Sequence, residues 1–387
     1  MNYKFPDNFY WGAATSAYQI EGGINNNDWA QAGREGKVPL AGLACDSYNH
    51  FPEDFDAAKL FGHNAYRFSI EWSRIEPEEG KFNQKEIEHY RKVISELRKR
   101  NIEPWVGLSH WTIPLWVSNK GGWKSEKIID YFSRYTEKIV SSLKDDVKFW
   151  ITINEPELCA YFSYLAGLWP PQEKNFFSFI KVIHNFIKVH REAYKIIKKI
   201  QPQAQVGIAT NNTYYEAYKN RPISVLLKTI IERLDHFYIL NRIQNYQDFI
   251  GLNYYFHCRI KGFKFNQNEN KKISDIEWEI YPEGIYYVLK NLEKYKKPIY
   301  ITENGLADAK DEKREWFIKE TLKNVHRAIQ EGIDVRGYFY WSLLDNFEWD
   351  KGFWPRFGLV EVDYKTLKRK IRPSAFKYGE ICKNNAL

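Results

Sequence analysis

The chain has 387 residues, of which 44% are hydrophobic and 27% charged, with a formal net charge of +8. This predicts a globular protein with a large core, and no apolar stretch is long enough to span a bilayer. The 57 basic and 49 acidic residues are spread along the chain, so we expect a solvated charged surface and neither a nucleic-acid nor a membrane partner.

Short apolar runs alternate with amphipathic stretches along the whole chain. The runs predict strands at residues 9–15, 64–70, 103–109, 148–153, 205–210, 248–254, 298–302 and 337–341. Helical patterns occupy residues 84–99, 126–143, 176–200, 223–240, 284–294, 311–331 and 373–382. Eight such repeats close into a (β/α)8 barrel, which we expect to be a single domain over residues 1–387. The polar segment 255–280 is expected to be a long excursion after the sixth strand.

The four cysteines, Cys45, Cys159, Cys258 and Cys382, are far apart and form no CxxC pair. This spacing is poor for zinc and weak for disulfides, so we expect a reducing, cytoplasmic location and neither a metal nor a cofactor. The first residues lack the apolar stretch of a signal peptide. Cys159 has no base beside it, so it is expected to be a small buried hydrophobe rather than a nucleophile.

Two glutamates lie at the ends of predicted strands, 148 residues apart. Glu155 stands before a proline, which keeps it out of the helical region, and Glu303 stands before Asn-Gly, a turn signal. In a (β/α)8 barrel the carboxyl ends of the strands carry the catalytic residues. Two carboxylates there are what acid-assisted cleavage of a glycosidic bond requires. For an isolated glutamate at a strand end, a surface salt bridge would be the favoured interpretation.

Several motifs resemble those of glycoside hydrolase family 1. They occur in the expected order at residues 9–15, 18–22, 67–75, 110–111, 154–156, 251–255, 302–305 and 341–349. The resemblance implies a retaining β-glycosidase on a (β/α)8 barrel. The chain is short for this family, so we expect trimmed loops over the barrel mouth. The run 166–171 and Phe256 also depart from the usual pattern, which affects the rim of the pocket and the leaving-group preference.

The resemblance also implies roles for the residues around the two glutamates. Glu303 would be the nucleophile, contacted by Arg67 and Tyr255, which favour its ionised form. Glu155 would be the acid/base, with its pKa raised by the anionic Glu303 about 5 Å away, as in retaining enzymes. Asn154 would hold the sugar 2-hydroxyl. A carboxylate at a helix N-terminus is a second reading of Glu155 that is compatible with the first.

A sugar-binding set is implied in the same way. Its members are Gln19, His110, Trp111, Asn253, Trp341, Glu348, Trp349 and Phe357. Trp341 would form the floor under the sugar ring, and Phe357 would close the side near the 6-hydroxyl. For a lone aromatic residue, packing in the core is the favoured interpretation. The acidic Glu348 would repel a 6-phosphate and so implies a neutral sugar.

We therefore predict an exo-acting β-glycosidase that removes terminal β-D-glucosyl units with retention, with galactosyl and fucosyl units as further candidates. Small β-glycosides and oligosaccharides would be the substrates, and transfer of the sugar to an alcohol a side reaction. Two alternatives stay open: a 6-phospho-β-glycosidase and a sugar-binding barrel that has lost turnover. A homo-oligomer is also open.

Overall fold

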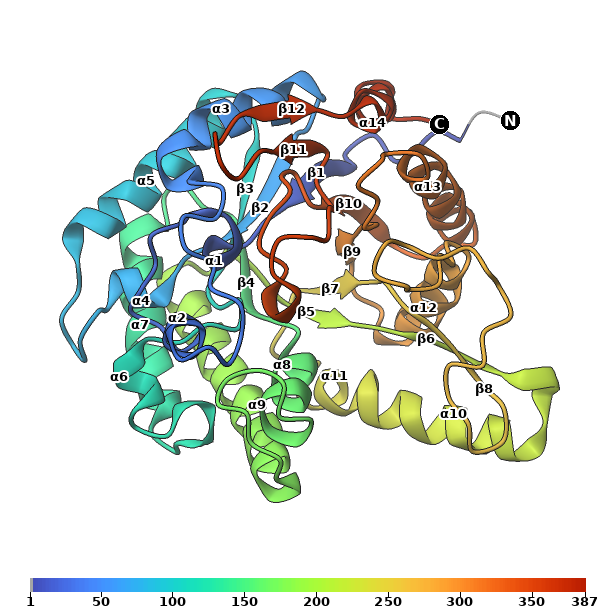
Figure 1. Cartoon of the computed structure of the whole chain (residues 1–387), viewed down its shortest axis with the longest axis horizontal. Helices are drawn as coiled ribbons and strands as arrows, with labels where there is room; N and C mark the ends of the chain where they lie inside the picture. The colour runs from blue at the N-terminus through green and yellow to red at the C-terminus, as the bar shows by residue number, and fades with distance from the viewer. Residues whose placement is uncertain (1–2) are drawn as a thin grey trace.

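The computed structural model describes residues 3–387 and has a closed barrel of eight parallel strands at its centre (Figure 1). In chain order these are β1 (Tyr10–Ala14), β2 (Ala65–Ser69), β3 (Glu103–Gly107), β4 (Phe149–Asn154), β5 (Gln205–Asn211), β7 (Phe249–Asn253), β9 (Ile299–Asn304) and β10 (Val335–Trp341). Each strand pairs with the next, and β1 closes the ring by pairing with β10. The predicted fold and all eight predicted strands are confirmed. One detail was wrong: Glu303 lies inside β9 rather than beyond it.

Helices surround the barrel. The longer ones are α3 (Ser47–Leu60), α5 (Gln84–Lys99), α7 (Ile128–Leu143), α9 (Phe176–Ile200), α10 (Pro222–Asp235), α12 (Gly284–Leu292), α13 (Arg314–Gln330) and α14 (Pro373–Asn384). Shorter helices lie between these elements: α1 (Ala17–Ile20), α2 (Asp28–Arg34), α4 (Trp72–Ile75), α6 (Leu115–Ser118), α8 (Pro156–Ala160) and α11 (Phe237–Ile243). The apolar periodicity explains helices such as α5, which buries Ile87, Ile94 and Leu97 on one face.

Two helical regions differ from the prediction. The predicted helix 223–240 is divided at His236 into α10 and α11. Helix α3 was not predicted, because Pro52 lies inside it and polar residues interrupt its apolar face.

Aromatic side chains fill the barrel interior, so the barrel is a packed core and not a pore. Trp105 stacks on Phe149 with 3.9 Å between the ring centroids, and Phe249, Tyr300 and Phe339 pack around the same indole. These five rings are buried. They close the barrel below the carboxyl ends of the strands, which leaves those ends to form the floor of any site at the mouth.

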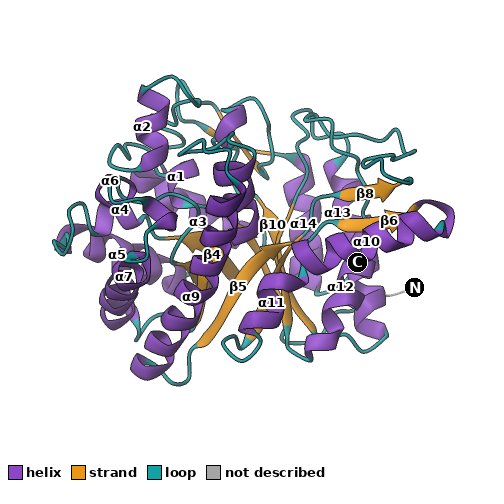
Figure 2. Cartoon of the chain, turned by 90° about the horizontal axis from the view of Figure 1, so that it is seen from below, coloured by secondary structure: helices purple, strands orange, loops and turns teal. Residues whose placement is uncertain are grey.

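Two small sheets lie outside the barrel. Strand β8 (His257–Ile260) belongs to the predicted excursion and pairs in parallel with β6 (Tyr214–Ala217), next to α10 (Figure 2). Strands β11 (Val360–Val362) and β12 (Arg369–Ile371) form an antiparallel pair. Within residues 3–387, no helix combines the length and apolar character needed to cross a bilayer.

Candidate active site

The two glutamates lie at the same end of the barrel. Glu155 directly follows β4 and is the residue before α8, with a left-handed backbone (φ +43°), and Pro156 begins that helix. Glu303 is the last residue but one of β9. Both side chains are buried. Because β4 and β9 run parallel in one barrel, their carboxyl ends bring both carboxyl groups to its mouth.

Glu303 is held by a cation and a phenol. The Arg67 Nη1 atom lies 2.5 Å from its Oε1, and the Tyr255 hydroxyl donates to its Oε2 at 2.8 Å. Arg67 also donates to the Thr302 carbonyl (3.0 Å) and to Asn154 Oδ1 (2.6 Å). The pKa of Glu303 is raised overall by burial, and the charge of Arg67 and the hydrogen bond from Tyr255 limit this rise. The structure thus places both predicted contact residues against this carboxylate.

Glu155 has a different environment. Within residues 3–387 its carboxyl group accepts one hydrogen bond, from Asn253 Nδ2 at 2.8 Å from Oε1. Burial, and then the negative charge of Glu303, raise the pKa of Glu155 well above its ordinary value. In this coupled pair we therefore expect Glu303 to lose its proton first, while Glu155 keeps its own. The predicted separation of about 5 Å stays a prediction.

Asn253 and Asn154 connect the two carboxyl groups. Asn253 donates to Asn154 Oδ1 (3.1 Å) as well as to Glu155, and it accepts a hydrogen bond from Thr302 Oγ1 (2.7 Å). Asn253 was predicted as a sugar-binding residue; in this structure its amide hydrogens point to the protein. The sequence analysis did not predict a role for Thr302, because threonine is a common residue in buried strands.

His110, which lies shortly after β3, contacts the same hydrogen-bond network through Asn154. Its Nε2 lies 3.2 Å from Asn154 Nδ2, and the Trp111 indole donates to the Asn154 carbonyl at 3.0 Å. Burial, and then the charge of Arg67, lower the pKa of His110 well below its ordinary value. The neutral ring can accept at Nε2 and keep its proton on Nδ1, which leaves one donor for a sugar hydroxyl.

Stacked aromatic rings form one wall of the site. The His110 ring lies parallel to Trp349 (6.0 Å, 8°) and nearly parallel to Trp341 (5.8 Å, 21°). Trp111 packs on Trp349 (4.6 Å) and on Trp169 (4.4 Å). Aromatic faces of this kind suit the C–H faces of a sugar ring, but each ring here also packs in the protein core.

Gln19 and Glu348 behave differently from the expectation for free sugar-binding groups. Both amide hydrogens of Gln19 are used, on Asn346 Oδ1 (3.0 Å) and the Phe347 carbonyl (2.8 Å), and Ser16 donates to its Oε1. The Glu348 Oε2 atom is enclosed and has no partner within residues 3–387.

Burial, and then the charge of Glu303, raise the pKa of Glu348 to about 8. With this raised pKa the carboxyl group is mostly neutral at neutral pH, and its expected repulsion of a 6-phosphate stays a prediction. A neutral carboxyl can both donate to and accept from a sugar hydroxyl. The nearby Lys351 donates to Asp350 Oδ2 at 3.3 Å.

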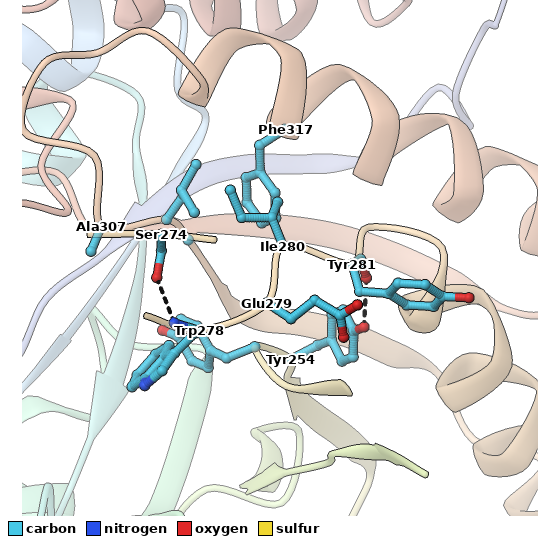
Figure 3. A pocket seen from close by; sticks show the side chains of 11 residues that line it. Tyr254, Ser274, Trp278, Glu279, Ile280, Tyr281, Ala307 and Phe317 are labelled. Carbon is cyan, nitrogen blue, oxygen red and sulfur yellow. Dashed lines mark hydrogen bonds between the residues drawn. The ribbon is translucent and has the colours of Figure 1, made fainter. Parts of the chain in front are cut away.

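The excursion after β7 adds another aromatic side chain, Trp278, beside Tyr255. Trp278 packs on Phe256 with 4.2 Å between ring centroids and lies 6.0 Å from Tyr255 and 6.2 Å from Phe357. Figure 3 shows a small cavity lined by Trp278, Tyr254 and other residues, with the Trp278 backbone N–H bonded to Ser274 Oγ. Trp278 belongs to no motif, so sequence reasoning missed it.

Other candidate chemistries lack support in the described chain. Within residues 3–387 no group of three or more His, Cys, Asp and Glu side chains is placed to hold a metal ion. Burial raises the pKa of Cys159, which favours the thiol over the reactive thiolate.

Comparison with known proteins identifies the family of the chain and its fold. The model of Glycosyl hydrolase family 1 matches residues 1–237 and 238–387. The chain is 36% identical to Beta-glucosidase A of Thermotoga maritima, over 99% of both chains. A structure titled beta-glycosidase from Pyrococcus horikoshii is 39% identical with a TM-score of 0.94, covering 100% of this chain and 96% of that one. The Thermotoga maritima beta-glucosidase in complex with glucoimidazole has a TM-score of 0.94 at 33% identity, covering 100% of both chains.

Proposed function

The chain belongs to glycosyl hydrolase family 1, and on that basis we propose that it is a retaining exo-β-glycosidase that removes terminal β-D-glucosyl units. The unequal environment of the two buried carboxyl groups carries the proposal. Glu303 is paired with Arg67 and Tyr255, whereas Glu155 accepts one bond from Asn253 and faces the charge of Glu303. One group is thus suited to attack and the other to hold a proton.

In the first step, Glu303 attacks the anomeric carbon as the bond to the leaving oxygen breaks, and Glu155 gives its proton to that oxygen. A glycosyl ester on Glu303 results. The ester removes the negative charge that raised the pKa of Glu155, so Glu155 becomes a base. It then takes a proton from water, the water oxygen bonds to the anomeric carbon, and the ester bond breaks to restore Glu303. Two inversions give net retention.

The leaving group lies against the aromatic rim. Phe256 and Trp278 present partly exposed apolar faces, whereas Trp169 is buried, packs on Trp111 and donates its indole N–H to Asp350 (2.9 Å). We propose small β-glycosides and short oligosaccharides as substrates, with glucosyl units preferred because two of the similar proteins are named beta-glucosidases. Galactosyl and fucosyl units are further candidates, and alcohols should compete with water for the ester.

We also propose a cytoplasmic location, supported by four buried cysteines that are not in disulfides. The whole chain would act as one catalytic domain, since strands from residue 10 to residue 341 close a single barrel.

The sharpest test is covalent labelling. A 2-deoxy-2-fluoro-β-glucoside with an activated leaving group should inactivate the enzyme and leave its label on the peptide that contains Glu303. The variant Glu303→Gln should take no label. Label on a peptide without Glu303 would refute the assignment.

An assay with a nitrophenyl β-glucoside distinguishes the proposed glycosidase from the sugar-binding protein and the 6-phospho-β-glycosidase. Nitrophenol release that Glu155→Gln greatly slows supports the proposal. Measurable sugar binding without any release would instead identify a binding protein, and a strong preference for the 6-phosphorylated glycoside would identify a phospho-glycosidase.

A further inference from the structure

Helix α10 turns an apolar stripe toward solvent. Leu226 and Leu234 expose 59% and 64% of their surface, and Ile223 and Ile230 are exposed with them. The spacing of three and four residues puts all four on one side of the helix. The residues of α10 that face the protein pack against β6, β8 and α11. A helix on a water-soluble barrel would ordinarily place such a stripe toward the core.

The loop after β8 adds two aromatic rings to this stripe. Phe263 exposes 77% of its surface, and Phe265 is also exposed. The loop is fixed at the beginning of α10, because the Gly262 backbone N–H donates to Ser224 Oγ at 3.0 Å. We call the six side chains together the α10 patch; they are Ile223, Leu226, Ile230, Leu234, Phe263 and Phe265. Contiguous exposed apolar patches of this kind mark interaction surfaces.

Cations border the α10 patch. The charged groups of Lys219, Arg221 and Lys261 lie 5.4, 5.5 and 4.8 Å from the centre of the Tyr218 ring. Lys264 stands between the two exposed phenylalanines in the sequence. None of these four cations makes an ion pair with a carboxylate in the part of the chain that the structure describes. Their charge is therefore available to an outside partner.

We propose that the α10 patch binds the surface of an anionic lipid bilayer, with α10 lying in the plane of the interface. Leucine, isoleucine and phenylalanine would enter the boundary between headgroups and acyl chains, while the bordering cations would meet lipid phosphates. Charge favours an anionic bilayer over a second copy of the chain as the partner. Two copies in contact at this patch would bring the unpaired cations of both together, and these would repel each other. The proposal replaces the expectation of no membrane partner, and it needs no spanning helix. It does not depend on the proposed glycosidase activity.

The test is co-sedimentation of the full chain with vesicles. Binding should be strong with phosphatidylcholine vesicles that contain phosphatidylglycerol and weak with phosphatidylcholine alone. It should also fall as salt is raised. Replacing Lys261 or Lys264 by glutamine should weaken binding about fivefold for each cation removed.

Apolar variants with a matched control complete the test. The double variant Leu226→Gln, Phe263→Ser should lose vesicle binding and keep the circular-dichroism spectrum and melting temperature of the parent, which shows that it is folded. Leu60→Gln removes a leucine of similar exposure (49%) on α3 and should bind as the parent does. Binding that is absent in the parent chain, or unchanged in the double variant, would overturn the proposal. A dimer in sedimentation velocity that the double variant dissociates, without lipid binding, would assign the patch to a second copy.

Discussion

Replacing Glu348 with glutamine should make the protein less sensitive to alkaline pH. The carboxyl group has an ordinary pKa of 4.5, and burial together with the charge of Glu303 raises it to about 8 in the folded protein. Between these values the folded state keeps a proton that the unfolded state has released. The stability that this group contributes is therefore complete below pH 4.5 and is lost as pH rises through 8. Glutamine imitates the neutral form and has no such dependence.

The magnitude follows from this interval. Each pH unit between the two pKa values costs about 1.4 kcal/mol, so the full loss between pH 5 and pH 8 is about 4 kcal/mol. Glu348 is only partly buried, although its Oε2 is enclosed. Contact with water reduces the effect, and we expect the stability of Glu348→Gln relative to the parent to rise by about 2–4 kcal/mol from pH 5 to pH 9.

Denaturant unfolding of both proteins at pH 5, 7 and 9 would measure this difference. Glu126→Gln, at a carboxylate that is 86% exposed, is the matched control and should follow the parent at every pH. If the curves of Glu348→Gln and the parent stayed parallel from pH 5 to pH 9, Glu348 would be ionised in the folded protein and the reasoning would be wrong.

Three further predictions concern the two glutamates and their surroundings. In Glu155→Gln, hydrolysis should slow far more for glycosides with poor leaving groups than for dinitrophenyl glycosides, and the alkaline limb of the kcat/KM profile should disappear; equal slowing for both classes would contradict a role as acid. Arg67→Lys keeps the charge but cannot make all three bonds, so kcat/KM should fall about 10- to 150-fold, the equivalent of one charge-assisted hydrogen bond of about 1.5–3 kcal/mol. The acid limb of the kcat/KM profile of Arg67→Lys should move to higher pH, because the pKa of Glu303 would rise. An acid limb at the same pH as in the parent would show that Arg67 does not determine the pKa of Glu303. In Gly305→Ala the new Cβ would overlap the Trp341 carbonyl oxygen, whereas in Gly107→Ala it makes only ordinary contacts. The first variant should therefore lose activity and thermal stability and the second should keep most of both, as assays and melting curves would show.

The barrel could be predicted because its signals are local and repeated. Each barrel strand is a short apolar run followed by a helical pattern, and eight repeats leave few other architectures. Elements outside that repeat could not be predicted in the same way. Strands β6 and β8 are stabilised by pairing with each other across about 40 residues, and α3 contains Pro52 in a helix with little amphipathic pattern.

The same division holds in the site. Glu155 and Glu303 could be found because each lies in a short motif at a strand end. Trp278 could not, since it reaches the site only through the course of the 255–280 excursion. The raised pKa of Glu348 could not be predicted from the sequence either, because the enclosure of its Oε2 atom depends on packing by distant segments. A sequence motif gives the residue type at a position, but it does not give the solvent exposure of the side chain, on which the pKa depends.

The different roles of the two glutamates depend on closure of the barrel. Arg67 lies on β2 and Glu303 on β9, which are not neighbours in the ring, since β1 and β10 separate them on one side. Their ion pair therefore crosses the mouth of the barrel and exists only when the ring is complete. Removing one partner of such a buried pair costs about 3–5 kcal/mol, because the other charge is left without compensation. A neutral substitution of Arg67 should thus reduce both stability and activity, whereas loss of Tyr255's hydroxyl, a neutral donor to the same carboxylate, should affect activity far more than folding.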